Sequence, residues 1–269
     1  MIKLIASDLD DTLLDRNANI SLENKEAIQR AIKRGLIFTI ATGRMFQATL
    51  PYAMELNLSS EQPLICYNGA LIKRVSGEVL YERPLEPQLA TAIINYGQER
   101  DWTINVYYDD RLFVSEINDK VNEYASYVGV DIEAVGDLAK FILEGNKGLH
   151  KILVNNEAEQ TKLRIEELRE LFGSQAQITN SRAKFIEITS LDAHKGQALH
   201  WLADFMGLNI KEVLAVGDSN NDLTMLQMAG VGVAVANASD YVKGQVDFIT
   251  SCNHEHAIAK IFEDYVLKK

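Results

Sequence analysis

The sequence contains few cysteines and prolines and no long apolar run, and each scarcity excludes a class of protein. Only 2 of the 269 residues are Cys and 4 are Pro, which excludes a disulfide-held scaffold and a collagen-like chain. Cys66 and Cys252 lie far apart and are expected to be free thiols in a reducing compartment. The apolar stretch before Asp8 is too short for a signal peptide, and no segment approaches the roughly 18 apolar residues that span a bilayer. We therefore expect a cytoplasmic protein that does not enter the membrane.

Basic residues are also in the minority. The chain has 27 Lys and Arg against 38 Asp and Glu, a formal net charge of −11, so its summed field repels nucleic acid and acidic lipid. The expected partner is a small molecule, and the sequence does not indicate the oligomeric state. With 47% apolar residues, a chain of this length is expected to form one or two globular domains.

The two ends of the chain show the same alternation of short apolar runs and helical stretches. The run at residues 2–7 is followed by a helix expected to begin at Ser21 and to stop near Gly35, and then by a second apolar run at residues 36–41. A strand–helix–strand unit of this kind predicts parallel strands. After residue 190 the pattern returns, with a helix over residues 194–206 and an apolar strand over residues 213–216. These patterns predict an α/β fold with a Rossmann-like parallel-sheet core.

The middle of the chain has a different character. From Pro84 onward, helical stretches at residues 89–100, 117–128 and 157–172 alternate with strands that carry Tyr, Thr and charged residues. Half-polar strands are typical of a sheet with one face open to solvent or to a cleft. We therefore expect an inserted α/β domain at residues 84–189, within a discontinuous core made of residues 1–83 and 190–269.

Three polar clusters follow apolar strands: residues 8–12 (Asp-Leu-Asp-Asp-Thr), residues 42–44 (Thr-Gly-Arg) and residues 217–222 (Gly-Asp-Ser-Asn-Asn-Asp). In an open parallel sheet, ligands bind outside the carboxyl ends of the strands. The clusters are therefore expected to meet at one edge of the core sheet.

The expected meeting point is rich in carboxylates, because Asp8 and Asp10 would lie near Asp218 and Asp222. Several like charges cannot all stay ionised without compensation. Oxygen ligands with room for water favour Mg²⁺, and a metal held in this way commonly binds phosphate. The sequence therefore predicts a magnesium site that binds a phosphorylated ligand.

A phosphate would also need neutral donors and a fixed positive charge. Thr42 is expected to supply a hydroxyl and a backbone N–H at the start of a helix, and Gly43 to let a backbone amide approach closely. Lys195, in the first turn of its helix, is expected to supply the positive charge, since a cation at a helix N-terminus needs an anion nearby.

These clusters, with His194-Lys-Gly196, resemble the four ordered motifs of the haloacid dehalogenase superfamily. Residues 67–70 (Tyr-Asn-Gly-Ala) and 230–234 (Gly-Val-Gly-Val-Ala) further resemble its Cof-type, sugar-phosphatase-like branch, whose cap is of type IIB. The resemblance covers nearly the whole chain. It implies a Rossmann-like core with an α/β cap inserted between the second and third motifs, which agrees with the change of pattern at residue 84.

The resemblance also implies roles for individual residues. Asp8 would attack phosphorus and form an aspartyl phosphate, and Asp10 would protonate the leaving oxygen and then activate water. Asp8, the backbone carbonyl of Asp10, and Asp218 would hold Mg²⁺, with Asn221 near the metal and the phosphate and Asp222 supporting the ligands, and either of these two residues could touch the metal. The phosphate contacts it implies are Leu9, Thr42, Gly43, Lys195 and Asn221, and Arg44 and Asn68 either face the leaving group or cap helices and turns.

The predicted activity is Mg²⁺-dependent hydrolysis of small phosphorylated metabolites, with sugar phosphates as the expected class. Two alternatives stay open: a phosphomutase of the same superfamily, which keeps its intermediate away from water, and a phosphometabolite-binding module without catalysis. Asp11 departs from the family, which usually has Gly at this position, and its side chain is expected to face solvent or to cap an amide. Within the insert, the residues expected to select the substrate are Tyr107, Tyr108, Arg111 and Lys184.

Overall fold

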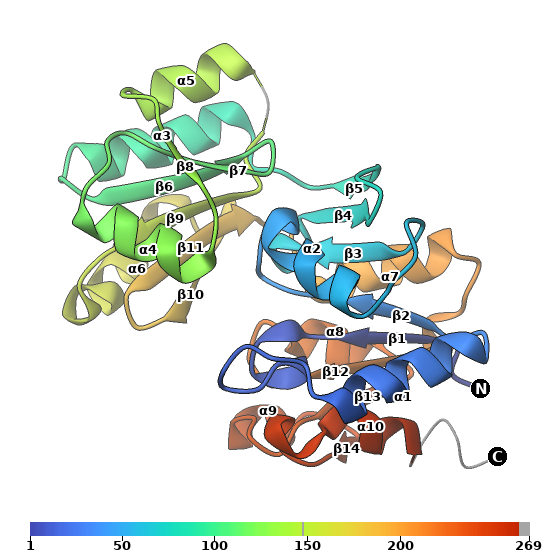
Figure 1. Cartoon of the computed structure of the whole chain (residues 1–269). Helices are drawn as coiled ribbons and strands as arrows, with labels where there is room; N and C mark the ends of the chain where they lie inside the picture. The colour runs from blue at the N-terminus through green and yellow to red at the C-terminus, as the bar shows by residue number, and fades with distance from the viewer. Residues whose placement is uncertain (147, 264–269) are drawn as a thin grey trace. The chain divides into compact units, whose positions relative to one another are not determined.

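The computed structural model describes residues 1–146 and 148–263 of the chain (Figure 1). The chain divides into two compact units. One consists of Met1–Tyr81 and the described residues from His194 onward, and the other of Glu82–Ala193. The fold is α/β throughout, as predicted, with a parallel sheet in the first unit. Among the described residues, no helix is both long and apolar enough to cross a membrane.

The first unit is built on a five-stranded parallel sheet in the order β14-β13-β12-β1-β2. Each residue of β1 and β12 is buried, the pattern expected of parallel strands that are covered on both faces. The central pairing aligns Ser7 of β1 with Val216 of β12 on one side and with Ile40 of β2 on the other. The strands are β1 (Leu4–Ser7), β2 (Ile37–Ile40), β12 (Val213–Gly217), β13 (Val231–Ala234) and β14 (Phe248–Ile249).

Helices cover both faces of this sheet (Figure 1). One pair that packs together is α1 (Leu22–Lys33) with α10 (Ala257–Ile261), and the other is α7 (Lys195–Phe205) with α8 (Leu223–Met228). The predicted cap of α1 is confirmed, because the Ser21 side chain accepts a hydrogen bond from the N–H of Asn24. The other helices of this unit are α2 (Phe46–Glu55) and α9 (Asp240–Lys243).

A small antiparallel sheet adjoins the edge of the parallel one. It contains β3 (Pro63–Cys66), β4 (Leu71–Arg74) and β5 (Val79–Glu82). A single parallel bridge between Ala41 and Ile65 joins β3 to the end of β2.

The second unit is a six-stranded, mainly antiparallel sheet in the order β10-β11-β9-β6-β7-β8. One face packs its apolar side chains, such as Ile104, Val106 and Ile152, against α3, α5 and α6. The other face carries polar side chains and is covered in part by α4, whose Tyr124 contacts Phe185. The strands are β6 (Thr103–Tyr108), β7 (Arg111–Val114), β8 (Ile132–Ala134), β9 (Lys151–Asn155), β10 (Ala176–Arg182) and β11 (Phe185–Ser190). The helices are α3 (Pro87–Gln98), α4 (Asp119–Val128), α5 (Leu138–Gly145) and α6 (Ala158–Phe172).

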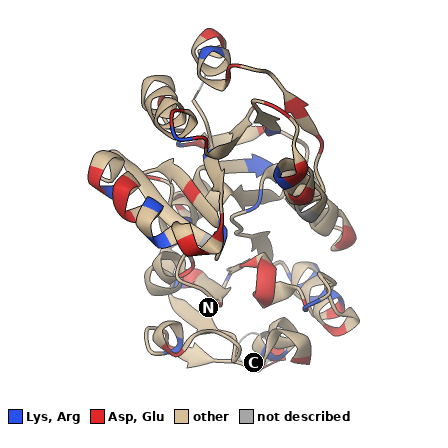
Figure 2. Ribbon diagram, turned by 90° about the vertical axis from the view of Figure 1, so that its left-hand side faces the viewer, with Lys and Arg blue, Asp and Glu red and all other residues tan. Residues whose placement is uncertain are grey.

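Lys and Arg residues are interspersed with Asp and Glu residues along the ribbon of both units (Figure 2).

Candidate active site

The three predicted clusters of the first unit meet at the carboxyl ends of its strands. Asp8 directly follows β1, and its N–H donates to the carbonyl of Val216 in β12 at 2.9 Å. On the other side, the N–H of Ala41 donates to the carbonyl of Ser7 at 2.8 Å. The pairing of β1 with both neighbours therefore delivers Asp8, Thr42 and Asp218 to one edge of the sheet, as the parallel-strand pattern predicted.

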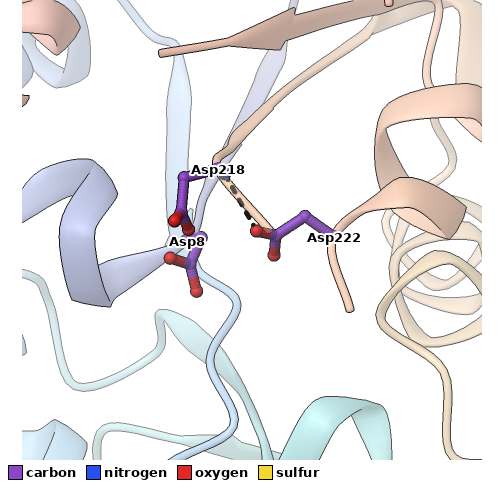
Figure 3. Close-up of side chains that lie close together, drawn as sticks. All are labelled: Asp8, Asp218 and Asp222. Atoms are coloured by element: carbon purple, nitrogen blue, oxygen red, sulfur yellow. Dashed lines mark hydrogen bonds between the residues drawn. The ribbon is translucent and has the colours of Figure 1, made fainter. Parts of the chain in front are cut away.

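Three carboxylates converge there, from Asp8, Asp218 and Asp222 (Figure 3). One oxygen from each lies within 4.8 Å of the others. Asp222 precedes α8, and its Oδ2 accepts hydrogen bonds from the N–H groups of Asp218 and Ser219, both at 3.0 Å. This turn requires Gly217, because a Cβ at that position would lie 2.6 Å from the Asp222 side chain.

Lys195 bridges two carboxylates of this acidic cluster, those of Asp8 and Asp222. Its Nζ is 2.6 Å from Oδ1 of Asp8 and 2.6 Å from Oδ1 of Asp222, and its side chain is fully buried. Burial alone would lower the pKa of Lys195, but the charges and hydrogen bonds of Asp222 and Asp8 raise it above the ordinary value. The anion predicted beside this lysine is therefore present as two protein carboxylates.

The acidic cluster still carries more negative charge than Lys195 neutralises, since three ionised carboxylates against one ammonium leave an excess of two. Burial, with repulsion from Asp222, raises the pKa of Asp8 well above its usual range despite Lys195. Burial and Asp222 likewise raise the pKa of Asp218 to about 7. A hard divalent cation would relieve this repulsion, and the all-oxygen donor set fits Mg²⁺. Asp222, expected only to support the ligands, belongs to this group.

One expectation for Thr42 is wrong. Its N–H does not begin a helix, because α2 starts only at Phe46, and it already donates to the carbonyl of Ile65 at 2.8 Å. Because the backbone N–H of Thr42 is used in the bridge between β2 and β3, Thr42 can offer a ligand its hydroxyl but not its N–H. The Thr42 hydroxyl oxygen accepts a hydrogen bond from the backbone N–H of Arg44 at 3.1 Å. The hydroxyl proton can still be donated to a ligand.

Gly43, Asn68 and Asn221 lie together near this edge of the parallel sheet. A Cβ on Gly43 would lie 3.0 Å from Oδ1 of Asn68, so a glycine at this position leaves room for the Asn68 side chain. Asn68 Oδ1 also accepts a hydrogen bond from Nδ2 of Asn221 at 3.0 Å. The Leu9 side chain is fully buried, so only its backbone could reach a ligand.

Arg44 neither caps a helix nor extends alone toward a ligand. Its guanidinium forms a two-pronged ion pair with the carboxylate of Asp10 and a further hydrogen bond to the hydroxyl of Tyr52. Burial opposes the charge of Arg44, but the bonds to Asp10 and its charge raise the pKa above the ordinary value. Tyr52 lies in α2 and belongs to none of the motifs, so its part in the site was not predicted.

The side chain of Asp11 faces solvent, as one of the two expectations for it had it. The φ of Asp11, 56°, is left-handed, and Asp is one of the side chains that tolerates this region. Its carbonyl accepts a hydrogen bond from Nδ2 of Asn237 at 2.8 Å.

The substrate-selecting candidates of the second unit are not equivalent. Tyr107 lies on the polar face of the sheet, where its hydroxyl pairs with that of Tyr124. Tyr108 lies on the opposite face, where it packs against Phe113 and Phe141 in the apolar core, so it is a structural residue because β-strand side chains alternate between faces. Arg111 forms an exposed ion pair with Glu133 and Lys184 is exposed.

Comparison with known proteins agrees with this geometry. Residues 5–262 match the family described as haloacid dehalogenase-like hydrolase. Two Bacillus subtilis proteins, each a 5-amino-6-(5-phospho-D-ribitylamino)uracil phosphatase, are similar over nearly their full length. YcsE is 33% identical over 99% of this chain and 96% of its own, and YwtE is 30% identical over 96% of each. The crystal structure of TM0651 from Thermotoga maritima is 29% identical and superposes with a TM-score of 0.88 over 98% of this chain and 97% of its own. The chain belongs to the family of haloacid dehalogenase-like hydrolases.

Proposed function

We propose that this protein is a Mg²⁺-dependent phosphatase of small phosphorylated metabolites, with sugar phosphates as the substrate class. The chain is a phosphoric monoester hydrolase in this proposal. The observation that carries it is the buried carboxylate of Asp8, which lies at the strand edge with one oxygen held by Lys195. A carboxylate fixed in this way is a nucleophile with a defined attacking atom.

The reaction begins when Oδ2 of Asp8 attacks phosphorus and the bond from phosphorus to the substrate oxygen breaks. Asp10 protonates the departing oxygen, and the product alcohol leaves an aspartyl phosphate. Asp10, now ionised, accepts a proton from water, and that water attacks phosphorus and releases inorganic phosphate with Asp8 restored. Lys195 and the hydroxyl of Thr42 stabilise charge on the transferring group, as positioned donors do in phosphoryl transfer.

Asp8, Asp218 and Asp222 would hold the metal, with the backbone carbonyl of Asp10 as a further ligand. When bound, Mg²⁺ supplies positive charge that offsets the phosphate oxygens and draws the substrate toward Asp8. The protein's own part is to keep the three carboxylates converged, which Lys195 and the amides of residues 218 and 219 do.

The inserted unit serves as the substrate-selecting cap in this proposal, with boundaries near the predicted residues 84 and 189. Its polar sheet face, which includes Tyr107 and the buried pair Lys151–Glu187 at 3.1 Å, supplies the candidate contacts. YcsE and YwtE are named for a phosphate carried on a ribityl chain, so phosphorylated polyols belong in any substrate test. The cytoplasmic location stays a prediction.

The test is a panel of sugar phosphates, phosphorylated polyols and p-nitrophenyl phosphate, assayed for inorganic phosphate with Mg²⁺. We expect multiple-turnover release from at least one alkyl phosphate, and none from Asp8→Asn. Interconversion of phosphate isomers without free phosphate would identify the phosphomutase instead. Tight binding of panel members without either reaction would identify the binding module and overturn the proposal.

A further inference from the structure

The Arg44 guanidinium holds both carboxylate oxygens of Asp10. Nε lies 2.8 Å from Oδ2, and Nη2 lies 2.6 Å from Oδ1. Two parallel, charge-assisted bonds of this kind fix the plane of a carboxylate as well as its position. Each oxygen of Asp10 keeps a second lone pair, which can carry the proton that Asp10 donates to the departing oxygen and later accept a proton from water.

Arg44 is itself held at three points. Its N–H donates to the hydroxyl of Thr42 at 3.1 Å, and its carbonyl accepts the N–H of Tyr67 at 2.9 Å. At the far end of the side chain, Nη1 donates to the hydroxyl of Tyr52 at 3.2 Å, and Cζ lies 5.2 Å from the centre of that ring. Both the backbone of Arg44 and its guanidinium are therefore held in place.

Asp10 needs such a partner more than Asp8 does. Its side chain is 45% exposed and lies outside the cluster formed by Asp8, Asp218 and Asp222. Within residues 1–146 and 148–263, the hydrogen bonds to the Asp10 carboxylate come from Arg44. An exposed carboxylate on a turn samples several rotamers, whereas a general acid must lie within hydrogen-bond reach of the departing oxygen.

We propose that Arg44 is the positioning residue of the general acid Asp10, and that Tyr52 keeps Arg44 in place for this task. The inference rests on the proposed phosphatase function and assigns Arg44 a role that works through Asp10. It replaces the expectation that Arg44 faces the leaving group. Tyr52 has no contact with the reacting groups in this scheme and acts by restricting the guanidinium.

The first test compares two leaving groups in Arg44→Ala, Arg44→Lys and Tyr52→Phe. An alkoxide leaving group needs the proton of Asp10, whereas p-nitrophenolate departs without it. For the fastest alkyl phosphate of the panel, we expect Arg44→Ala to lower kcat about a hundredfold, a typical cost of misplacing a catalytic group, with little change in KM. p-Nitrophenyl phosphate should lose much less. Arg44→Lys keeps the charge without the two-pronged geometry and should recover only part of the loss, and Tyr52→Phe should show the same pattern at about tenfold or less.

The second test is a double-mutant cycle with Asp10→Asn. If Arg44 acts through Asp10, adding Arg44→Ala to Asp10→Asn costs nothing further. A full additional loss in the double variant would show that Arg44 contacts the substrate and would overturn the proposal. Equal losses for both leaving groups would overturn it as well.

The matched control is Arg74→Ala. Arg74 lies in β4 of the same unit and also forms ion pairs with two carboxylates, those of Glu61 and Glu78. It should leave kcat unchanged for both substrates. If Arg44→Ala and Tyr52→Phe lower the melting temperature but leave the ratio of the two kcat values unchanged, Arg44 is structural and the inference is wrong. Absence of phosphate release by the parent protein would instead defeat the proposed function, and the inference with it, before any variant is compared.

Discussion

The ammonium of Lys195 lies 2.6 Å from a carboxylate oxygen of Asp8, and both side chains are buried. They are 187 residues apart in the sequence, and they meet because α7 begins beside the strand edge at which β1 ends. Lys195 holds Asp222 at the same distance. It thus restrains the candidate nucleophile and one of the carboxylates proposed to hold the metal, and this dual contact underlies the first two predictions.

Replacing Asp8 with Asn should abolish turnover without unfolding the protein. The amide has nearly the same volume, and its oxygen can still accept a hydrogen bond from Lys195, but it cannot form the acyl phosphate. We expect no phosphate release above background in an assay with the best substrate of the panel, and a circular dichroism spectrum like that of the parent. Substantial residual release would show that Asp8 is not the nucleophile.

Lys195→Met should lower the free energy of unfolding by about 3–5 kcal/mol, because breaking a buried ion pair leaves uncompensated charge behind. Since Mg²⁺ could neutralise part of that charge, added Mg²⁺ should restore more stability to the variant than it gives to the parent. Urea titrations with EDTA or with Mg²⁺ measure both effects. The control is Lys211→Met, which alters an exposed lysine and should change stability by less than about 0.5 kcal/mol. Equal stabilisation of Lys195→Met and the parent by Mg²⁺ would contradict the expected compensation.

Much of this site could be predicted because parallel strands obey a strict geometric rule. Their carboxyl ends share one edge of the sheet, so Asp8, Thr42 and Asp218 could be placed together without coordinates. The bridge between Ala41 and Ile65, which occupies the N–H of Thr42, could not be foreseen because nothing in the sequence shows that β3 lies against β2.

Other features depend on side-chain placement or on weak local patterns. The pair of Arg44 with Asp10 requires particular rotamers on residues 34 positions apart, and no spacing rule encodes it. In the second unit, β8 and α5 were not predicted. β8 has only three residues, and most of them are exposed. α5 spans only eight residues, so neither element produces a long periodic pattern of apolar residues.

In the absence of metal, stability should fall as pH rises from about 4 to 7, and Asp218 should contribute to that fall. Its pKa is raised from 3.8 to about 7 in the folded protein. Between these values the folded state binds more protons than the unfolded state, so raising the pH favours unfolding. Urea titrations in EDTA at pH 5 and pH 7.5 should show a smaller drop for Asp218→Asn than for the parent. Equal drops would show that Asp218 does not carry this raised pKa.

Mg²⁺ should raise the melting temperature of the parent protein, and EDTA should inactivate it reversibly. A ligand that binds only the folded state stabilises it by mass action, by about 2.7 kcal/mol at a hundred times its dissociation constant. Differential scanning calorimetry at several Mg²⁺ concentrations measures the shift, and the triple variant with Asn at positions 8, 218 and 222 should show none. An unchanged melting curve at millimolar Mg²⁺, together with full activity in EDTA, would reject the metal site.

Asp11→Gly should retain kcat within about tenfold, in contrast to Asp8→Asn. The left-handed backbone at Asp11, with φ of 56°, suits Gly at least as well as Asp, and the hydrogen bond from Asn237 goes to the carbonyl, which every residue at this position keeps. The Asp11 side chain is exposed and lies outside the group formed by Asp8, Asp218 and Asp222. A factor of ten in rate corresponds to only about 1.4 kcal/mol of barrier. Steady-state kinetics on the best substrate therefore tests whether the Asp11 side chain takes part in catalysis. The companion variant Asp11→Asn, which keeps the left-handed preference and removes the charge, should behave in the same way. A loss of a thousandfold or more in both variants would show that the carboxylate of Asp11 contacts the metal or the substrate directly.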